Sequence, residues 1–259
     1  MSEKLYHYST FSKFINGISK TNSIRLSSIL NVNDPLDYKD RVYRNHHLFK
    51  KGEGISIENL HKLTEEYKTT LNTKWITNCK IACFSTSNEE NKLKGYQLAN
   101  LWSYYAENHT GICIVLNKEK VVNYFKENFK LFHPLCEQVD YKDRLSYCSY
   151  KIDYTNNEIK GVLDNKSTLF FEKLKSWDRE QEYRLICFSK NEFEYIPLEG
   201  MIEEIILGQK ISLENQEIIK GKNLSINISK MNYFGGDGKF EKIAIKSNFW
   251  KEMAEIEKN

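Results

Sequence analysis

Two glutamates separated by one residue form the acidic pair of this 259-residue chain that is best placed for chemistry. Glu180 and Glu182 lead into an apolar run, and we expect one strand to begin at Glu180 and continue to Phe188. Side chains two apart on a strand project from the same face, so Glu180, Glu182 and Arg184 are predicted to face one side of a sheet. One carboxylate can stabilise a developing positive charge and another can take a proton from an attacking group. Solvated acidic pairs are also common at strand starts, so the pair alone predicts no catalysis.

Two further polar segments stand on or beside predicted strands. His7 lies within Leu5–Tyr8, and Ser85-Thr86-Ser87 ends the strand predicted for Lys80–Ser85. Taken singly, a histidine on a strand is usually a half-buried side chain, and a Ser-Thr-Ser stretch is usually a loop. The order of the three segments along the chain is more informative than any one of them.

Other site types are disfavoured by spacing. Cys79 and Cys83 would lie ~13 Å apart on a strand, which is too far for one zinc ion with bonds of about 2.3 Å. His133 and Cys136 form a lone pair, so we predict no metal. The glycine-rich residues 235–239 lack the spacing of a phosphate-binding loop and predict a hairpin turn. A cysteine nucleophile has no local signature here, although the sequence leaves it open.

Composition bounds the class of protein. Apolar residues make up 40% of the chain, which excludes intrinsic disorder. A net charge of +3, from 38 basic and 35 acidic side chains, argues against a dedicated nucleic-acid binder. The N-terminus has no cationic and apolar signal segment, and apolar runs such as Ile112–Leu116 are only strand-length. We therefore expect a cytoplasmic protein with free thiols and no membrane contact.

The spacing of apolar residues predicts both helices and strands, in one α+β domain. A polar, lysine-rich stretch at about 35–75 is interpreted as a helical surface insertion. Helices are predicted at 11–18, 98–109 (stopped by Gly111), 119–125, 170–177 and 213–219. Strands are predicted at 5–8, 24–27, 80–85, 112–116, 180–188, 202–207 and 226–231.

Several short segments between residues 5 and 208 together resemble a bacterial family catalogued as domain of unknown function 2971. They are Leu5-Tyr6-His7-Tyr8, Arg25-Leu26-Ser27, Asn33-Asp34-Pro35, Cys83-Phe84-Ser85, Leu101-Trp102-Ser103, Tyr105-Ala106, His109 with Gly111-Ile112, Trp177 with Glu180-Gln181-Glu182-Tyr183-Arg184, and Glu204-Ile205-Ile206 with Gly208. Tyr104 stands where a histidine is expected in that family.

That family is in turn similar to the ADP-ribosyltransferases, which implies a split β-sheet core with flanking helices and NAD as a substrate. In that superfamily a first strand supplies a His or Arg, a second a Ser-Thr-Ser or Tyr, and a late strand a Glu, matched here by His7, Ser85–Ser87 and Glu182. The bond between nicotinamide and ribose breaks through an oxocarbenium-like centre. The resemblance implies that Glu182 stabilises this centre and that Glu180 contacts or deprotonates the acceptor.

The same resemblance implies roles in NAD binding for eight further residues. His7 would bond a ribose hydroxyl, Arg25 would meet the pyrophosphate, and an aromatic residue would stack on the nicotinamide. The implied set is His7, Tyr8, Arg25, Ser85, Thr86, Ser87, Trp102 and Tyr105. Packing of a helix on a sheet also explains Trp102 and Tyr105, and a salt bridge also explains Arg25.

The function implied by the resemblance is transfer of ADP-ribose from NAD to a macromolecule, either nucleic acid or protein, with a possible setting in toxin action or phage defence. NAD hydrolysis without an acceptor is a close alternative. A non-catalytic module that binds a nucleotide or a protein partner is a third, motivated by the mixed motif pattern and by Tyr104.

Overall fold

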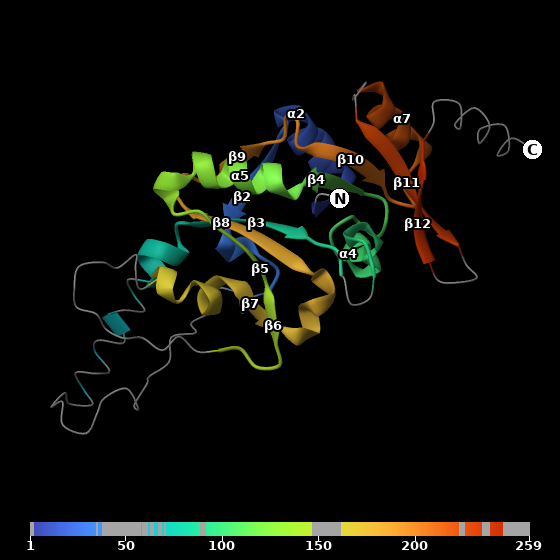
Figure 1. The fold of residues 1–259 in the computed structure, drawn as a ribbon. Helices are drawn as coiled ribbons and strands as arrows, with labels where there is room; N and C mark the ends of the chain where they lie inside the picture. Colours follow the sequence, from blue (N-terminus) through green and yellow to red (C-terminus); the bar gives the residue numbers. More distant parts are fainter. Residues whose placement is uncertain are drawn as a thin grey trace, which may run out of the picture.

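The computed structural model of the chain describes residues 3–34, 36–37, 58, 62, 65–66, 69, 71–88, 92–146, 162–222, 226–234 and 239–245. Most of the predicted insertion at 35–75 lies outside these residues. Within it, Leu71–Ile76 forms a short π-helix, η3. Helices and a mixed sheet make up the described part of the chain (Figure 1).

One half of the main sheet is built around a strand that is apolar throughout. Its strand order is β12-β11-β10-β4-β1, and β10 and β11 form its one parallel pair. Residues 112–116 of β4 are all buried, as a continuous apolar run predicts for a central strand. The bounds are β1 Lys4–Ser9, β4 Ile112–Asn117, β10 Ile202–Leu207, β11 Asn227–Phe234 and β12 Lys239–Ala244. The glycine-rich segment between β11 and β12 lies outside the described residues, but the two strands pair antiparallel, as a hairpin requires.

The other half of the main sheet is centred on β3 and β8, which pair along their whole length. β5 pairs with the outer edge of β8, and β9 pairs with β2. β1 and β2 share one edge of β3: β1 pairs at Ser85, whereas β2 pairs at Lys80 and Ile81. The sheet therefore branches at β3. The bounds are β2 Ser23–Ser28, β3 Cys79–Ser85, β5 Leu135–Gln138, β8 Glu182–Phe188 and β9 Glu194–Pro197.

Three longer helical segments begin at residues that cap them with a side-chain oxygen. Thr10 accepts from the Lys13 amide, Asn117 from the Lys120 amide and Ser212 from the Asn215 amide. The first segment runs from Phe11 to Thr21 through α1 (Phe11–Lys13), the π-helix η1 (Phe14–Ile18) and α2 (Ser19–Thr21). The other two are α5 Lys118–Asn128 and α7 Leu213–Gly221.

Shorter elements complete the described structure. They are η2 Ile29–Asn31, η4 Gly95–Gln97, α4 Ala99–Tyr104, η5 Lys130–Phe132, η6 Ser167–Phe171 and η7 Lys175–Glu180, together with β6 Asp140–Lys142 and β7 Glu172–Leu174, which pair in parallel.

The two faces of the β3–β8 pair are covered by different segments (Figure 1). On one face, Val121 and Phe125 of α5 share a core cluster with Phe84 and Leu185. On the other, Phe170 of η6 packs with Ile81 and Ile186. Side chains of β8 are buried along its whole length, so any polar group on this strand lies inside the protein.

One predicted helix is wrong, and another is shorter than predicted. Residues 170–177 form the end of η6, then β7, then part of η7, because 172–174 pair with β6. α4 ends at Tyr104, and Glu107, Asn108 and His109 all have positive φ, so His109 lies in a turn. Gly111 does not stop this helix. A Cβ there would lie 2.3 Å from the Ser9 carbonyl oxygen, so glycine lets the chain pass the end of β1.

The cysteines at 79, 83, 113, 136 and 187 are free, as predicted, and Cys148 lies outside the described residues. In the part of the chain that the structure describes, no helix combines the length and apolar character needed to span a membrane.

Candidate functional site

The three polar segments singled out in the sequence come together where the sheet branches. Ser85, at the end of β3, pairs with Glu182 of β8 on one side and with Tyr6 of β1 on the other. Directly paired strand residues project from the same face. The side chains of Tyr6, Ser85 and Glu182 thus form a row across three strands.

Glu180 does not lie on the strand, contrary to the sequence prediction. It ends η7, and Gln181 adopts a left-handed conformation with φ of 47° before β8 begins at Glu182. The turn is fixed to the end of β3. The Thr86 amide donates to the Gln181 carbonyl at 2.8 Å, and the Ser85 hydroxyl donates to the Glu180 carbonyl. This turn brings Glu180 back to the same side as Glu182.

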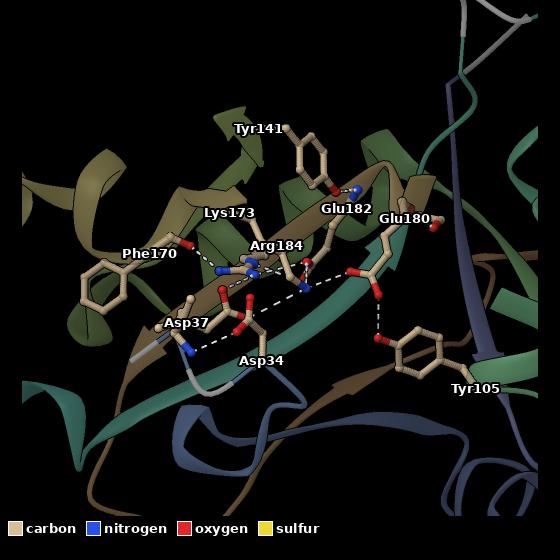
Figure 2. A network of polar contacts seen from close by, with 11 residues as sticks. Asp34, Asp37, Tyr105, Tyr141, Phe170, Lys173, Glu180, Glu182 and Arg184 are labelled. Atoms are coloured by element: carbon tan, nitrogen blue, oxygen red, sulfur yellow. Dashed lines mark hydrogen bonds and ion pairs between the residues drawn. The ribbon is translucent and has the colours of Figure 1, made fainter. Parts of the chain in front are cut away.

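Glu182 is held by two cations. Its Oε1 accepts from Arg184 Nε at 2.9 Å, and its Oε2 accepts from Arg184 Nη2 at 3.0 Å and from Lys173 Nζ at 3.2 Å (Figure 2). Arg184 also donates to the Phe170 carbonyl at 2.7 Å and to Asp37 Oδ1 at 2.9 Å. The Arg184 guanidinium is fully buried, and these four acceptors replace its lost hydration.

Glu180 is held differently, by one cation and one phenol. Its Oε2 accepts from Lys173 Nζ at 2.7 Å, and its Oε1 accepts from the Tyr105 hydroxyl at 2.7 Å. Lys173 comes from β7, and its Nζ lies 4.7 Å from the centre of the Trp177 ring. Figure 2 shows Glu180 between Lys173 and Tyr105, at the end of the network nearest α4.

The term buried ionic cluster is used below for Asp37, Lys173, Glu180, Glu182 and Arg184, all of which are buried. Burial alone would raise the pKa of Glu182, but Arg184 and Lys173 outweigh it and lower that pKa to about 2. Burial raises the pKa of Asp37 in spite of the same two cations. Burial also raises the pKa of the Tyr105 phenol, and the charge of Glu180 adds to the effect.

His7 is not part of the cluster. It neighbours Tyr6 on β1, so the two side chains project from opposite faces of the sheet. Its ring lies 5.6 Å from that of Phe84, and its Nδ1 lies 3.3 Å from the Cys83 carbonyl oxygen. Burial lowers the pKa of the imidazole. The shared location predicted for His7 and Glu182 thus holds for their strands and not for their side chains.

The hydroxyls of Thr86 and Ser87 are engaged in the local fold. Thr86 Oγ1 donates to the Gln138 side chain at 3.2 Å and to the Gln181 carbonyl at 3.1 Å. Ser87 Oγ accepts from the Gly95 amide at 3.3 Å. Together with Ser85, these residues fix the turn before β8 and the loop after β3.

Of the aromatic candidates, Tyr105 contacts the buried ionic cluster directly. Trp102 is fully buried and donates to the Tyr96 carbonyl at 2.8 Å, so it packs in the core. Tyr8 meets Trp102 edge-on at 5.1 Å, and its hydroxyl donates to the Gly95 carbonyl at 2.6 Å. Tyr104 points outward, with 65% of its surface exposed.

Arg25 lies away from these groups. It is exposed on β2, in the stretch of that strand that pairs with β9, and its guanidinium carbon lies 4.2 Å from the centre of the Phe193 ring. The structure thus gives Arg25 a stacking contact rather than a place beside the carboxylates.

Three members of this network were missed in the sequence. They are Asp37, Lys173 and Tyr141, whose hydroxyl accepts from the Glu182 amide at 2.9 Å. Lys173 carries a weak signal, because Glu172 and Lys173 interrupt the apolar residues Leu169–Leu174. Asp37 carries none, since its partner Arg184 lies 147 positions away. Among the described residues, no group of three or more His, Cys, Asp or Glu side chains is arranged to hold a metal ion.

A protein-family model matches a stretch of the chain that holds most of this network, namely Tyr105, Tyr141, Lys173, Glu180, Glu182 and Arg184. Residues 101–185 match the family model described as protein of unknown function DUF2971. This match supports the resemblance to the DUF2971 family that the sequence motifs indicated. The DUF2971 match includes both glutamates and leaves out His7 and Ser85. No curated protein and no solved structure matches the chain.

Proposed function

We propose that this chain is an ADP-ribosyltransferase that uses NAD as a substrate and transfers ADP-ribose to a macromolecule, either nucleic acid or protein. The observation that carries the proposal is the row of Tyr6, Ser85 and Glu182, which joins β1, β3 and β8 where the sheet branches. The resemblance drawn from the sequence requires these three strands to be neighbours. On this proposal, the branched sheet corresponds to the split sheet of that superfamily.

The reaction breaks the bond between ribose C1′ and the nicotinamide nitrogen. The bonding electron pair goes to that nitrogen, so the positively charged pyridinium leaves as neutral nicotinamide. The oxocarbenium-like ribose is then captured by a lone pair of the acceptor, which gives up a proton. Carboxylates beside C1′ favour this path because they stabilise the developing positive charge. Glu180 and Glu182 are the carboxylates that the proposal assigns to this region.

The test is release of nicotinamide from NAD by the purified protein, with and without cell extract, using NAD labelled on the adenosine side. We expect nicotinamide release together with label on protein or nucleic acid. A double variant with Glu180→Gln and Glu182→Gln should lose both. Glu203→Gln should keep them, because Glu203 lies on β10 and forms an ion pair with Lys4 of β1. Free ADP-ribose as the sole labelled product would make the protein a hydrolase. The absence of nicotinamide release by the folded wild type would contradict the proposal.

A second candidate is a non-catalytic module that binds a nucleotide. It is favoured by the complete engagement of Glu182 with Arg184 and Lys173, and by the projection of His7 from the other face. Calorimetry separates the two candidates. NAD that binds without releasing nicotinamide would support the module. In a separate assay, growth arrest on expression that is relieved in the double variant would support a toxin-like enzyme.

A further inference from the structure

The buried ionic cluster holds more negative than positive formal charge. Its carboxylates are Asp37, Glu180 and Glu182, and its cations are Lys173 and Arg184. Three negative and two positive charges leave one formal negative charge. A charge buried without a partner is strongly unfavourable, so a cationic group that reached this cluster would be stabilised there.

The excess charge is not shared equally among the three carboxylates. Both oxygens of Glu182 accept from Arg184, and one also accepts from Lys173. Asp37 is paired with Arg184 at 2.9 Å and lies 3.8 Å from Lys173. Glu180 contacts one cation, Lys173, and its other oxygen is bonded to the neutral phenol of Tyr105. Of the three carboxylates, Glu180 therefore has the least compensated charge.

Glu180 lies at the end of the cluster that contacts Tyr105, and it is as deeply buried as Glu182, with 4% and 5% of their surfaces exposed. Its partner Tyr105 is half-buried and directly follows α4, and the last residue of that helix, Tyr104, is largely exposed. Asp37 and Arg184 lie at the opposite end, against the backbone of Phe170 (Figure 2). A ligand that entered beside α4 would meet Glu180 before Glu182.

We propose that Glu180 is the carboxylate that faces ribose C1′ of NAD, and that Glu182 and Tyr105 are positioning residues for it. This assignment rests on the proposed function. As the bond from C1′ to nicotinamide breaks and its electron pair moves to the ring nitrogen, Glu180 offsets the positive charge left on the ribose. Glu182 acts through Lys173, whose ammonium it fixes beside Glu180, and Tyr105 fixes the other carboxylate oxygen. Glu182 already offsets the charge of Arg184 through two hydrogen bonds, whereas Glu180 accepts none from that guanidinium.

The test is the steady-state kinetics of nicotinamide release by Glu180→Gln, Tyr105→Phe and Glu182→Gln. We expect Glu180→Gln to lower kcat about 100-fold and to leave the KM for NAD nearly unchanged. Tyr105→Phe should lower kcat about tenfold, again with little change in KM, because a positioning residue does not bind the substrate. The folded fraction of Glu182→Gln should retain more turnover than Glu180→Gln. Glu203→Gln on β10 and Tyr195→Phe on β9 are the matched controls.

Two results would overturn the assignment while leaving the proposed function intact. One is wild-type turnover in Glu180→Gln, and the other is a larger kcat loss in folded Glu182→Gln than in Glu180→Gln. A rise in KM with unchanged kcat in Tyr105→Phe would make Tyr105 a binding group and contradict its positioning role. If Glu182→Gln fails to fold, the Glu180→Gln and Tyr105→Phe results decide alone. If the wild type releases no nicotinamide, the proposed function and this assignment fail together.

Discussion

Arg184 and Asp37 form a buried ion pair across 147 positions of sequence, with Nη2 2.9 Å from Oδ1. The pair joins β8 to the segment that follows η2, and the same guanidinium also holds Glu182. One side chain thus connects the early part of the chain to the strand that carries the candidate site. Stability and site geometry are consequently linked in this protein.

Removal of the Glu182 charge is expected to destabilise the fold strongly. In Glu182→Gln, Arg184 and Lys173 stay buried but lose the carboxylate that both contact. Breaking a buried pair in this way costs about 3–5 kcal/mol. Urea unfolding of the variant checks this value. Glu203→Gln removes a partly exposed ion pair and should change stability by at most about 1 kcal/mol. Equal losses in the two variants would contradict the prediction.

The pKa of Glu182 predicts a loss of stability in acid. Because its pKa in the folded state is lowered from 4.5 to about 2, its contribution is fully present above pH 4.5 and is lost as the pH falls towards 2. The shift corresponds to about 3 kcal/mol. The measurement is the free energy of unfolding of the wild type and of Glu182→Gln from pH 6 to pH 2. The difference between the two proteins should shrink over this interval, and a constant difference would refute the prediction.

Lys173 and Glu180 are expected to be energetically coupled. Lys173→Met leaves the carboxylates of Glu180 and Glu182 without their shared ammonium, whereas the double variant Lys173→Met, Glu180→Gln removes one of these charges as well. The double variant should therefore be less destabilised than the sum of the two single variants, by about 1–3 kcal/mol. Thermal or urea unfolding of all four proteins gives this coupling. Simple additivity would show that the contact contributes little.

Gly111 is predicted to tolerate no side chain. A Cβ at this position would lie 2.3 Å from the Ser9 carbonyl oxygen and 3.0 Å from the backbone of Ala106, and neither backbone group can move freely. Gly111→Ala should therefore destabilise by about 1–3 kcal/mol. A Cβ at Gly17, within η1, would instead have no neighbouring atom within 4 Å. Gly17→Ala should therefore stabilise the protein by about 0.5–1 kcal/mol. A comparison of the two melting temperatures tests both statements.

The elements that sequence predicts well here depend on local patterns. The apolar run Ile112–Leu116 becomes the central strand β4, and Glu182–Phe188 becomes β8. The spacing of Phe170, Leu174 and Trp177 satisfies a helix equally well, but pairing of β7 with β6 replaces it by a strand between two helical turns. A competing partner strand elsewhere in the chain is not visible in that spacing.

The candidate site shows the same contrast between local patterns, which the sequence contains, and tertiary contacts, which it does not. His7, Ser85 and Glu182 are singled out by residue type and chain order, and the strands that carry them, β1, β3 and β8, are neighbours in the sheet. The face from which His7 projects depends on the register of β1 against β3, which sequence does not give. Lys173 and Asp37 reach Glu182 and Arg184 through tertiary packing, so no short motif contains them.

The branch at β3 has a mechanical consequence. Among the described strands, Tyr6 and Ser85 are the one residue pair in register between β1 and β3, whereas seven such pairs join β3 to β8. Opening that pair breaks no other backbone ladder, and it leaves the contacts of His7 with Cys83 and Phe84 as links between β1 and β3. The backbone pairing of β3 is thus sparse towards β1 and continuous towards β8, and the two meet beside Glu182.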